Sequence, residues 1–459
     1  MPTYRTRESA RSVVVPAIDV PSSVACLRSL GRRGVRTIAV SDREMTPAFR
    51  SAYCDETATV PSPHQDLVAY KDALLSLAKR SDVGTVVPVR EEDVYVLAKY
   101  RDEFEPHVGT PWPSIDTLGA VQDRIRLFTI AGEAGVSAPE TRLLDATAEW
   151  DRKWIVKSRY SILADEYVDG YPPQACVDPP TTKYLRPGTK PDIDGITAEM
   201  GHVPLLQEYV TTTDEYGFFA IYDRGEALAT FQHRQNRGYS YAGGASAFRE
   251  SIFDPELEKA GRTLLDSLEW HGVAMVEFLR ETDSGAYKLM EVNPRFWSSL
   301  PFSVRAGADF PYYYWALAND APEEIEDGYE TGVAGHFIRG ELLHLHSILT
   351  EDNPLVARPS FTASLRDVLE STVRHPRFDY LRLDDPCPFV RDAINTAIAF
   401  RSHIGSEEAT EERQITRSGS AWEEPTDERE SDPGDVLDEL DRDQVLGLET
   451  TGEANERDG

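Results

Sequence analysis

Two strand-like runs in the second half of the chain carry a pair of glutamates that few folds can tolerate. The runs Val273–Leu279 and Tyr287–Val292 flank an Asp-Ser-Gly turn sequence at 283–285, which is typical of a β-hairpin. With the turn centred on its serine, Glu277 and Glu291 are equidistant from it and face each other across the ladder, with Cβ atoms about 5 Å apart. The sequence therefore predicts a hairpin in which two like charges are directly opposed.

Opposed like charges destabilise a hairpin, so something must compensate them. The apolar neighbours Val273, Phe278 and Leu289 indicate that at least one face is buried, and a divalent cation is then the natural partner. Asn293 lies two residues beyond Glu291 and shares its face if the strand continues. Oxygen ligands without His or Cys favour magnesium or manganese. The residues alone leave a second interpretation open, in which both glutamates lie on a solvated strand face.

The first part of the chain, residues 12 to 118, alternates strand-like and helix-like segments. The expected elements are strands at Ser12–Ile18, Val35–Val40 and Gly84–Val89 and helices at Pro21–Leu30 and Asp66–Arg80. This alternation predicts a Rossmann-like parallel sheet in an α/β domain. No Gly-x-Gly-x-x-Gly follows the first strand, so the sequence gives no support for a dinucleotide site there.

The amino-acid composition disfavours some classes of binding partner. The 459 residues carry 79 acidic and 48 basic side chains, a net charge of −31, which disfavours nucleic acid or an anionic membrane. Only nine of the basic residues are lysines, and together with the acidic excess this resembles proteins of salt-loving archaea. The four cysteines have no metal-ligand spacing. We expect a cytoplasmic protein, because Met1–Arg11 lacks an apolar signal segment and no apolar run approaches the ~18 residues of a membrane helix.

The rest of the chain divides into three parts. Residues 119–330 contain the chemistry, with a subdomain at about 150–210, and residues 331–404 form a small C-terminal part with helices at Thr362–Thr372 and Asp392–Phe400. Residues 405–459 carry 19 acidic and 5 basic residues, so we expect a disordered acidic tail with one short helix near Val436–Val445.

The run Glu-Val-Asn-Pro-Arg-Phe-Trp at 291–297 resembles the metal-binding core of the ATP-grasp superfamily. The resemblance implies an α+β ATP-grasp core in two parts behind the N-terminal parallel-sheet domain. It makes Glu277, Glu291 and Asn293 ligands of magnesium or manganese, and it gives Arg295 a catalytic contact with phosphate or substrate. The ending Phe-Trp-Ser-Ser looks like a branch near carbamoyl-phosphate synthase and the carboxylate–amine ligases, of haloarchaeal origin.

Elements for binding ATP are expected before this hairpin, and the sequence contains them in order. Arg124 precedes a Gly-Val-x-x-Pro turn at 135–139, where relatives often have lysine, and Lys157 ends a buried strand, Lys153–Lys157. In many relatives a glycine-rich loop follows and covers the phosphates. Here no glycine occurs between Ser158 and Gly170, so a shorter lid or the charge of Arg159 would have to replace it.

A strand that contacts adenine is the next expected element. Its counterpart is Leu205–Val210, so the resemblance implies that Glu208, Tyr209 and Val210 bind the adenine edge. A second acid about seven residues later binds the ribose hydroxyls in the family. Glu215 has that separation, and Asp214 is the competing choice.

The substrate side is expected between this strand and the hairpin. Arg234 is predicted to act on the phosphoryl group and Arg237 and Arg305 to bind substrate, whereas His233 is more typical of a packed histidine. The implied reaction activates a carboxylate with ATP as an acyl phosphate, joins it to an amine or similar nucleophile, and releases ADP and phosphate. Alternatives are a kinase or carboxylase with the same ATP cleft, or a non-catalytic ATP-binding protein. A homodimer is common in the family.

Overall fold

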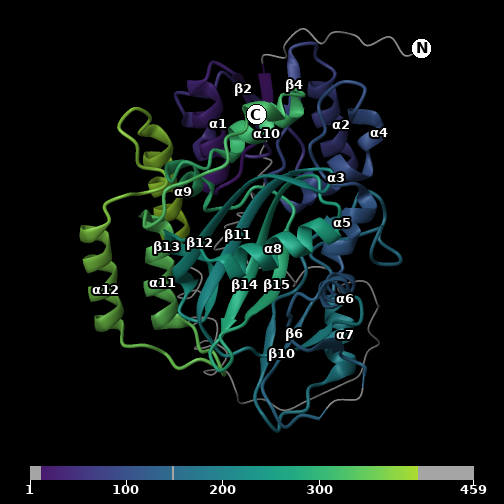
Figure 1. The fold of residues 1–459 in the computed structure, drawn as a ribbon, viewed down its shortest axis with the longest axis vertical. Coiled ribbons are helices and arrows are strands. Elements are labelled where there is room, and N and C mark those ends of the chain that lie inside the picture. The colour runs from purple at the N-terminus through teal and green to yellow at the C-terminus, as the bar shows by residue number, and fades with distance from the viewer. Residues whose placement is uncertain (1–11, 147–148, 402–459) are drawn as a thin grey trace, which may run out of the picture.

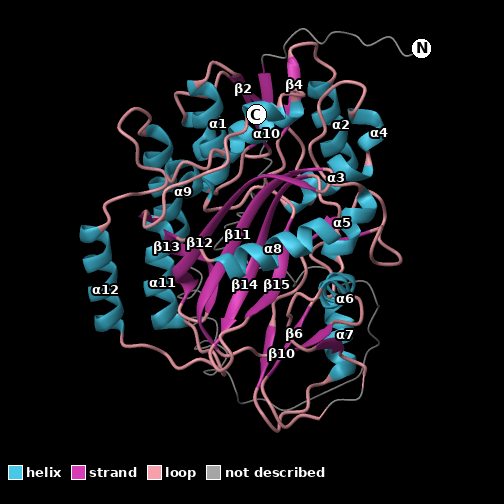
Figure 2. Cartoon of the chain, viewed as in Figure 1, coloured by secondary structure: helices cyan, strands magenta, loops and turns pink. Residues whose placement is uncertain are grey.

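The structure is a computed structural model that describes residues 12–146 and 149–401. Strands and helices are mixed along the chain, as predicted, and the strands form one parallel and three antiparallel sheets in the described part (Figure 2). The predicted acidic tail, with its expected helix at Val436–Val445, lies outside these residues. Within the described ranges, none of the helices is both long enough and apolar enough to cross a bilayer.

The N-terminal sheet is parallel and has the strand order β3-β2-β1-β4. Its strands are β1 (Ser12–Pro16), β2 (Arg36–Ser41), β3 (Glu56–Thr59) and β4 (Val83–Val86). The helices that pack around it are α1 (Pro21–Arg32), α2 (Leu67–Ala78), α3 (Glu91–Lys99) and α10 (Phe310–Ala318) (Figure 1). Residues 13–15 of β1 are fully buried because helices cover both faces of such a sheet. The strands and helices expected here from the sequence are confirmed.

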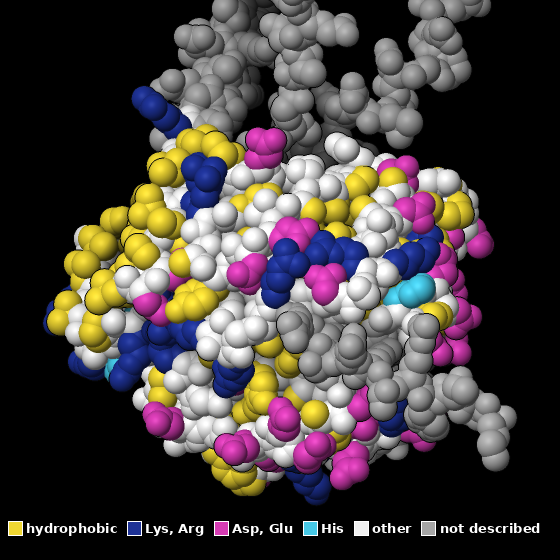
Figure 3. All heavy atoms as spheres, turned by 90° about the horizontal axis from the view of Figure 1, so that it is seen from above, with side chains coloured by type: hydrophobic (Ala, Val, Ile, Leu, Met, Phe, Trp, Pro, Cys, Tyr) yellow, Lys and Arg dark blue, Asp and Glu magenta, His cyan; other side chains and the backbone are white. Residues whose placement is uncertain are grey.

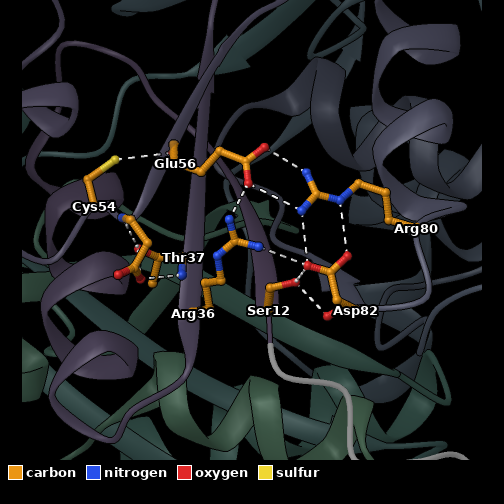
Figure 4. Close-up of polar contacts among 8 residues, drawn as sticks. Ser12, Arg36, Thr37, Cys54, Glu56, Arg80 and Asp82 are labelled. Atoms are coloured by element: carbon orange, nitrogen blue, oxygen red, sulfur yellow. Dashed lines mark hydrogen bonds and ion pairs between the residues drawn. The ribbon is translucent and has the colours of Figure 1, made fainter.

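Ion pairs and hydrogen bonds connect the strands at the amino-terminal edge of this sheet (Figure 4). Arg80 donates to Glu56 at 2.6 Å and to Asp82 at 3.0 Å, and Arg36 bridges the same two carboxylates at 2.7 and 3.1 Å. Ser12 donates to the Asp82 carboxylate at 3.2 Å. These bonds connect the first residues of β1, β2 and β3 to the turn before β4, so they fix the edge that lies away from the carboxyl ends of the strands.

The largest sheet is the six-stranded one, with the order β15-β14-β11-β12-β13-β16. Its strands are β11 (Thr212–Asp223), β12 (Glu226–Ser240), β13 (Gly243–Ser251), β14 (Gly272–Glu281), β15 (Tyr287–Asn293) and β16 (Ala334–His336). Helix α8 (Pro255–Ser267) covers one face, where a Cβ on Gly261 would lie 2.2 Å from the Phe218 ring. The absence of a side chain at Gly261 therefore lets the helix approach the sheet.

A smaller antiparallel sheet, of order β5-β10-β6-β9, has a hydrophobic core of its own. Its strands are β5 (Thr141–Leu143), β6 (Trp154–Lys157), β9 (Lys183–Leu185) and β10 (Leu205–Glu208), and it packs with α7 (Ile193–Met200). The core residues are Leu144, Trp154, Val156, Leu185, Ile196, Met200 and Leu206. Because this core is separate from the main one, the small sheet forms a distinct packing unit.

Short elements connect these layers. They are α4 (Arg101–Phe104), α5 (Ile115–Gln122), α6 (Arg124–Ala134), the strand pair β7 (Leu163–Ala164) and β8 (Cys176–Val177), and α9 (Leu300–Arg305).

The segment after residue 330 is built onto the six-stranded sheet. β16 pairs with β13, and α11 (Ile338–Thr350) packs on β12 and β13. α12 (Phe361–Arg374) and a helix at 387–401 follow, as expected from the sequence. Exposed apolar side chains such as Val373 and Ile398 belong to these helices, and hydrophobic side chains gather on this side of the molecule when it is seen from above (Figure 3).

The charged edge of the parallel sheet makes stability depend on pH. Hydrogen bonds from Arg80 lower the pKa values of Glu56 and Asp82. Their contribution is complete above the unfolded carboxyl pKa of about 4 and is lost as the pH falls through the folded values. We expect Glu56→Gln to cost about 1 kcal/mol at pH 7, a fall of ~2 °C in melting temperature by circular dichroism, and much less at pH 3.5.

The matched control is Glu370→Gln, which breaks an ion pair of 2.6 Å with Arg366 on the exposed surface of α12. That variant should melt like the wild type at both pH values. A melting difference for Glu56→Gln that stays constant from pH 7 to pH 3.5 would exclude a contribution from its charge.

Candidate functional site

A cavity of about 780 Å³ lies where the three main sheets meet. One wall is formed by the loops that follow β1, β2 and β4 at the carboxyl edge of the parallel sheet. A second wall is formed by β6, β9 and β10 of the small sheet, and a third by β11, β12, β14 and β15 of the large sheet. The carboxyl edge of a parallel sheet is where loops converge on ligands in α/β proteins, so this cavity is the candidate site.

The two glutamates of the hairpin face each other across the third wall, as the sequence predicts. Glu277 and Glu291 are register partners in the β14–β15 ladder. The turn alone would place Glu277 opposite Met290, because Phe278 pairs with Leu289, but the register shifts beside Glu277. This bulge restores the pairing with Glu291, and bulges next to functional sites commonly redirect a side chain in this way.

Asn293 completes the group. Its Nδ2 lies 3.2 Å from Glu277 Oε1 and 3.5 Å from Glu291 Oε1, and its Oδ1 accepts a hydrogen bond of 3.0 Å from Arg295. All four of these residues line the cavity. The structure therefore brings together the three side chains for which the sequence predicts a metal, with the amide nitrogen of Asn293 turned towards the carboxylates.

The electrostatic cost of this arrangement appears in the carboxyl pKa values. Burial, and then the charge of Glu291, raises the pKa of Glu277 to about 8. Burial alone would raise the pKa of Glu291 too, but the charges of Arg124 and Lys157 outweigh it and lower that pKa. Near neutral pH the site therefore holds one carboxylate and one carboxylic acid, and a bound cation would displace the proton.

Two basic residues face the glutamates from other elements. Lys157 ends β6, and within the described residues no ion pair holds it. Burial, and then the charge of Arg124, lowers the pKa of Lys157 to about 7. Arg124 begins α6 and donates to Glu291 Oε2 at 3.2 Å. Both side chains line the cavity, so cations from α6 and β6 meet the carboxylates of the hairpin.

The loop that follows Lys157 is fastened to the start of α6. Arg124 donates to the carbonyl oxygens of Ser158 and Tyr160 at 3.1 and 2.9 Å, and the Ser161 amide donates to the Gln122 carbonyl. Arg159 makes a two-pronged contact with the carboxylate of Asp123 at 3.0 and 2.6 Å. The charge of Arg159 is therefore used within the fold, and this loop is held by side chains where relatives are expected to have glycines.

The residues expected to bind adenine and ribose also line the cavity. Glu208 lies at the end of β10, with Tyr209 and Val210 next in the chain. Glu215, on β11, accepts a hydrogen bond of 2.6 Å from Gln235 on β12. Burial, and then the charge of Glu291, raises the pKa of Glu215 to about 7.

Arg295 is held by a residue that sequence reasoning missed. Its Nε donates to Glu91 at 2.9 Å, and Gln122 donates to the same carboxylate at 3.0 Å. Glu91 begins α3, just after the chain leaves the carboxyl end of β4. Its place after a predicted parallel strand could have indicated Glu91 as a site residue, because side chains at the carboxyl ends of parallel strands converge on one edge of the sheet.

The three arginines expected on the substrate side do not line this cavity in the structure. Arg234 pairs with Glu250 at 3.1 Å, while its strand neighbours His233 and Gln235 line the cavity. Alternate residues of a strand point to opposite faces, so Arg234 faces away.

Arg237 and Arg305 stabilise other parts of the fold. Arg237 donates to Glu341 of α11 and to Ser371 of α12, both at 2.7 Å. Arg305 donates to the Phe378 carbonyl at 2.7 Å. His233 lies on the wall but is buried, and burial, followed by the charge of Arg249, lowers its pKa to about 3, so its imidazole is neutral.

No family model matches the sequence, and no curated protein matches it significantly. Solved structures do match. An N5-carboxyaminoimidazole ribonucleotide synthetase in complex with ADP superposes with a TM-score of 0.53 at 16% identity, over 81% of this chain and 100% of its own. The biotin carboxylase domain of Hydrogenobacter thermophilus 2-oxoglutarate carboxylase, solved with MgADP and bicarbonate, gives 0.53 at 13% identity, over 71% and 73%.

This chain has the ATP-grasp fold. Pyruvate carboxylase from Rhizobium etli matches with a TM-score of 0.51 at 15% identity, over 69% of this chain and 30% of that longer one. The small sheet and the large sheet each supply one wall of the cavity, and the parallel sheet supplies the third.

The fastened loop can be tested directly. Arg124→Met removes the two hydrogen bonds to the Ser158 and Tyr160 carbonyls, so we expect amide hydrogen exchange in residues 158–161 to rise at least ~10-fold. Arg126→Met, on the exposed side of the same helix, is the control and should exchange like the wild type. Unchanged exchange in Arg124→Met would show that the loop does not depend on this side chain.

Proposed function

We propose that this protein is a magnesium- and ATP-dependent ligase that activates a carboxylate as an acyl phosphate and joins it to an amine or similar nucleophile. One observation carries the proposal: the Glu277–Glu291 pair and the cations Lys157 and Arg124 converge on one cavity from separate elements. Such a cavity offers oxygen ligands for a metal and cations for phosphates side by side. The solved structures of the same fold that were crystallised with ADP or MgADP agree with this use of the cavity.

The donors fit a divalent cation. The two carboxylates are held together although one of them takes up a proton near neutral pH, and a cation is the ligand that would replace that proton. Only oxygen donors are offered, which suits magnesium or manganese. Asn293 would join as a third ligand after its amide turns by 180°, because its nitrogen faces the carboxylates and its oxygen faces Arg295. The ion, when bound, would neutralise phosphate charge.

The nucleotide would lie along the small sheet. The backbone of Glu208–Val210 would bind the adenine edge, and Glu215, held by Gln235, would accept from a ribose hydroxyl. Lys157 would bind phosphate oxygens at the opposite end of this path. Asp214 stays the alternative for the ribose.

The chemistry then requires charge neutralisation and exclusion of water rather than a protein nucleophile. The carboxylate oxygen of the substrate attacks the terminal phosphorus of ATP, and ADP leaves. Lys157 and Arg295 both line the cavity and would stabilise the negative charge of the transferring group, with Glu91 keeping Arg295 oriented. The nucleophile next attacks the acyl carbon, and phosphate leaves with the electron pair of the C–O bond.

Nucleophile-dependent ADP release tests the proposed function. Pools of small carboxylates and amines are added with ATP and magnesium in molar potassium chloride, and ADP and phosphate are measured with and without bicarbonate. A ligase releases ADP only when both a carboxylate and a nucleophile are present. ADP release that requires bicarbonate would identify a carboxylase, and release that needs no nucleophile and leaves a stable phosphorylated product would identify a kinase.

Lys157→Ala should chiefly weaken nucleotide binding. Phosphate charge raises the pKa of Lys157 from about 7, so ADP binding without metal should take up protons between pH 7 and 8. We expect ADP affinity to fall at least ~10-fold and the proton uptake to decrease, measured by titration calorimetry in two buffers of different ionisation enthalpy. Lys288→Ala, a lysine of β15 outside the cavity wall, is the control. Unchanged ADP affinity would exclude Lys157 from the nucleotide site.

Glu291→Ala should abolish ADP release, by a factor of at least ~100, while circular dichroism stays like that of the wild type. The reason is that Glu291 supplies one of two opposed carboxylates, and its removal relieves repulsion without opening the core. Wild-type ADP release from this variant would refute the metal assignment.

A further inference from the structure

The cavity extends past the residues assigned to the nucleotide and reaches the loops of the parallel sheet. The residues at that end come from the segments after β1, β2 and β4, among them Asp19, Asp42, Thr46, Glu91 and Glu92. We call this end of the cavity the N-terminal wall. Nothing in the proposed function yet assigns a ligand to it.

The cations of the N-terminal wall are already engaged by carboxylates. Arg43 lies 3.3 Å from Asp19, Arg90 lies 3.2 Å from Asp93, and Arg295 lies 2.9 Å from Glu91. An anionic substrate group would have to compete with these pairs. The wall is therefore poorly suited to a phosphate or a second carboxylate.

Carboxylates at this wall exceed the cations. Glu92 is 4% exposed and faces His64 at 3.4 Å. Asp42 is half-buried, and within the described residues its carboxylate makes no hydrogen bond or ion pair. Arg90 is thus shared among three carboxylates, those of Asp93, Glu92 and Asp42. The local charge is negative, and it attracts a cation.

A buried hydroxyl of the N-terminal wall also lacks a partner. Thr46 is 1% exposed and belongs to the cavity lining, and its Oγ1 has no hydrogen-bond partner among the described residues. Buried polar groups are nearly always hydrogen-bonded, so this hydroxyl at the cavity wall can accept a hydrogen bond from a ligand or from water. A ligand N–H could donate to this hydroxyl, and a cationic nitrogen could pair with the Asp42 carboxylate in the same cavity.

From this wall we propose that the amine substrate carries a second, non-reacting nitrogen that is positively charged and binds at Asp42. This inference rests on the proposed ligase function. The attacking nitrogen must be uncharged to have a lone pair, so a wall that selects a cation recognises another group of the same molecule. The substrate class is then a diamine or a basic amino acid rather than a simple amine or a phosphorylated one.

Binding of 1,4-diaminobutane, compared with 1-aminobutane, tests the wall without any turnover. In titration calorimetry at low salt we expect the diamine to bind at least ~10-fold more tightly, and Asp42→Asn to remove that preference. Glu370→Gln is the matched control, because it deletes one negative charge on the exposed α12 surface of the same acidic protein. Equal weakening by both variants, or a diamine preference that survives in Asp42→Asn, would overturn the inference.

Turnover separates this inference from the proposed function. With ATP and the carboxylate pool, ADP release is measured for lysine against norleucine and for 1,4-diaminobutane against 1-aminobutane. We expect KM at least ~10-fold lower for the doubly basic member of each pair, and Asp42→Asn to raise that KM alone. Equal or better use of the neutral members would overturn the inference while supporting a ligase. No nucleophile-dependent release from any compound would instead count against the ligase, and the calorimetry would still decide on Asp42.

Discussion

The repulsion between Glu277 and Glu291 is the interaction on which the rest of this site depends. Two carboxylates directly opposed in a ladder destabilise the hairpin, and here the pair is held in place by a bulge, by Asn293 and by the surrounding apolar core. The two glutamates differ in pKa. Burial and the charge of Glu291 raise the pKa of Glu277, whereas the charges of Arg124 and Lys157 lower that of Glu291. The proposed cation would compensate this repulsion at the cavity wall.

The cations around this pair belong to a connected arrangement. Arg124 contacts Glu291 and at the same time fastens the loop after Lys157, so the hairpin carboxylate and this loop share one side chain. Asp123 and Arg159 strengthen the same junction. Side-chain hydrogen bonds thus hold the loop after Lys157 at the cavity wall, where the sequence has no glycine-rich segment.

Structural features that depend on a short sequence repeat were predicted well. The period of two in the hairpin placed Glu277 opposite Glu291, and the alternation of buried strands and helices gave the parallel sheet. The turn lies one register position away from the one expected, with Phe278 opposite Leu289, and the bulge beside Glu277 shifts the register back. The two shifts cancel, so Glu277 still pairs with Glu291. The same period of two along β12 places Arg234 on the opposite face from His233 and Gln235.

The sequence alone determined the fold class, the opposed carboxylates and the order of the cavity elements, because each depends on spacing along a few neighbouring residues. Only the tertiary structure decided which charged groups are available to a ligand. Arg237 and Arg305 are bound to α11, α12 and the Phe378 carbonyl, and Glu91 holds Arg295. Asp42 is left without a hydrogen bond or ion pair among the described residues. Ion pairs between residues far apart in sequence depend on how the sheets pack, and no local pattern records that packing.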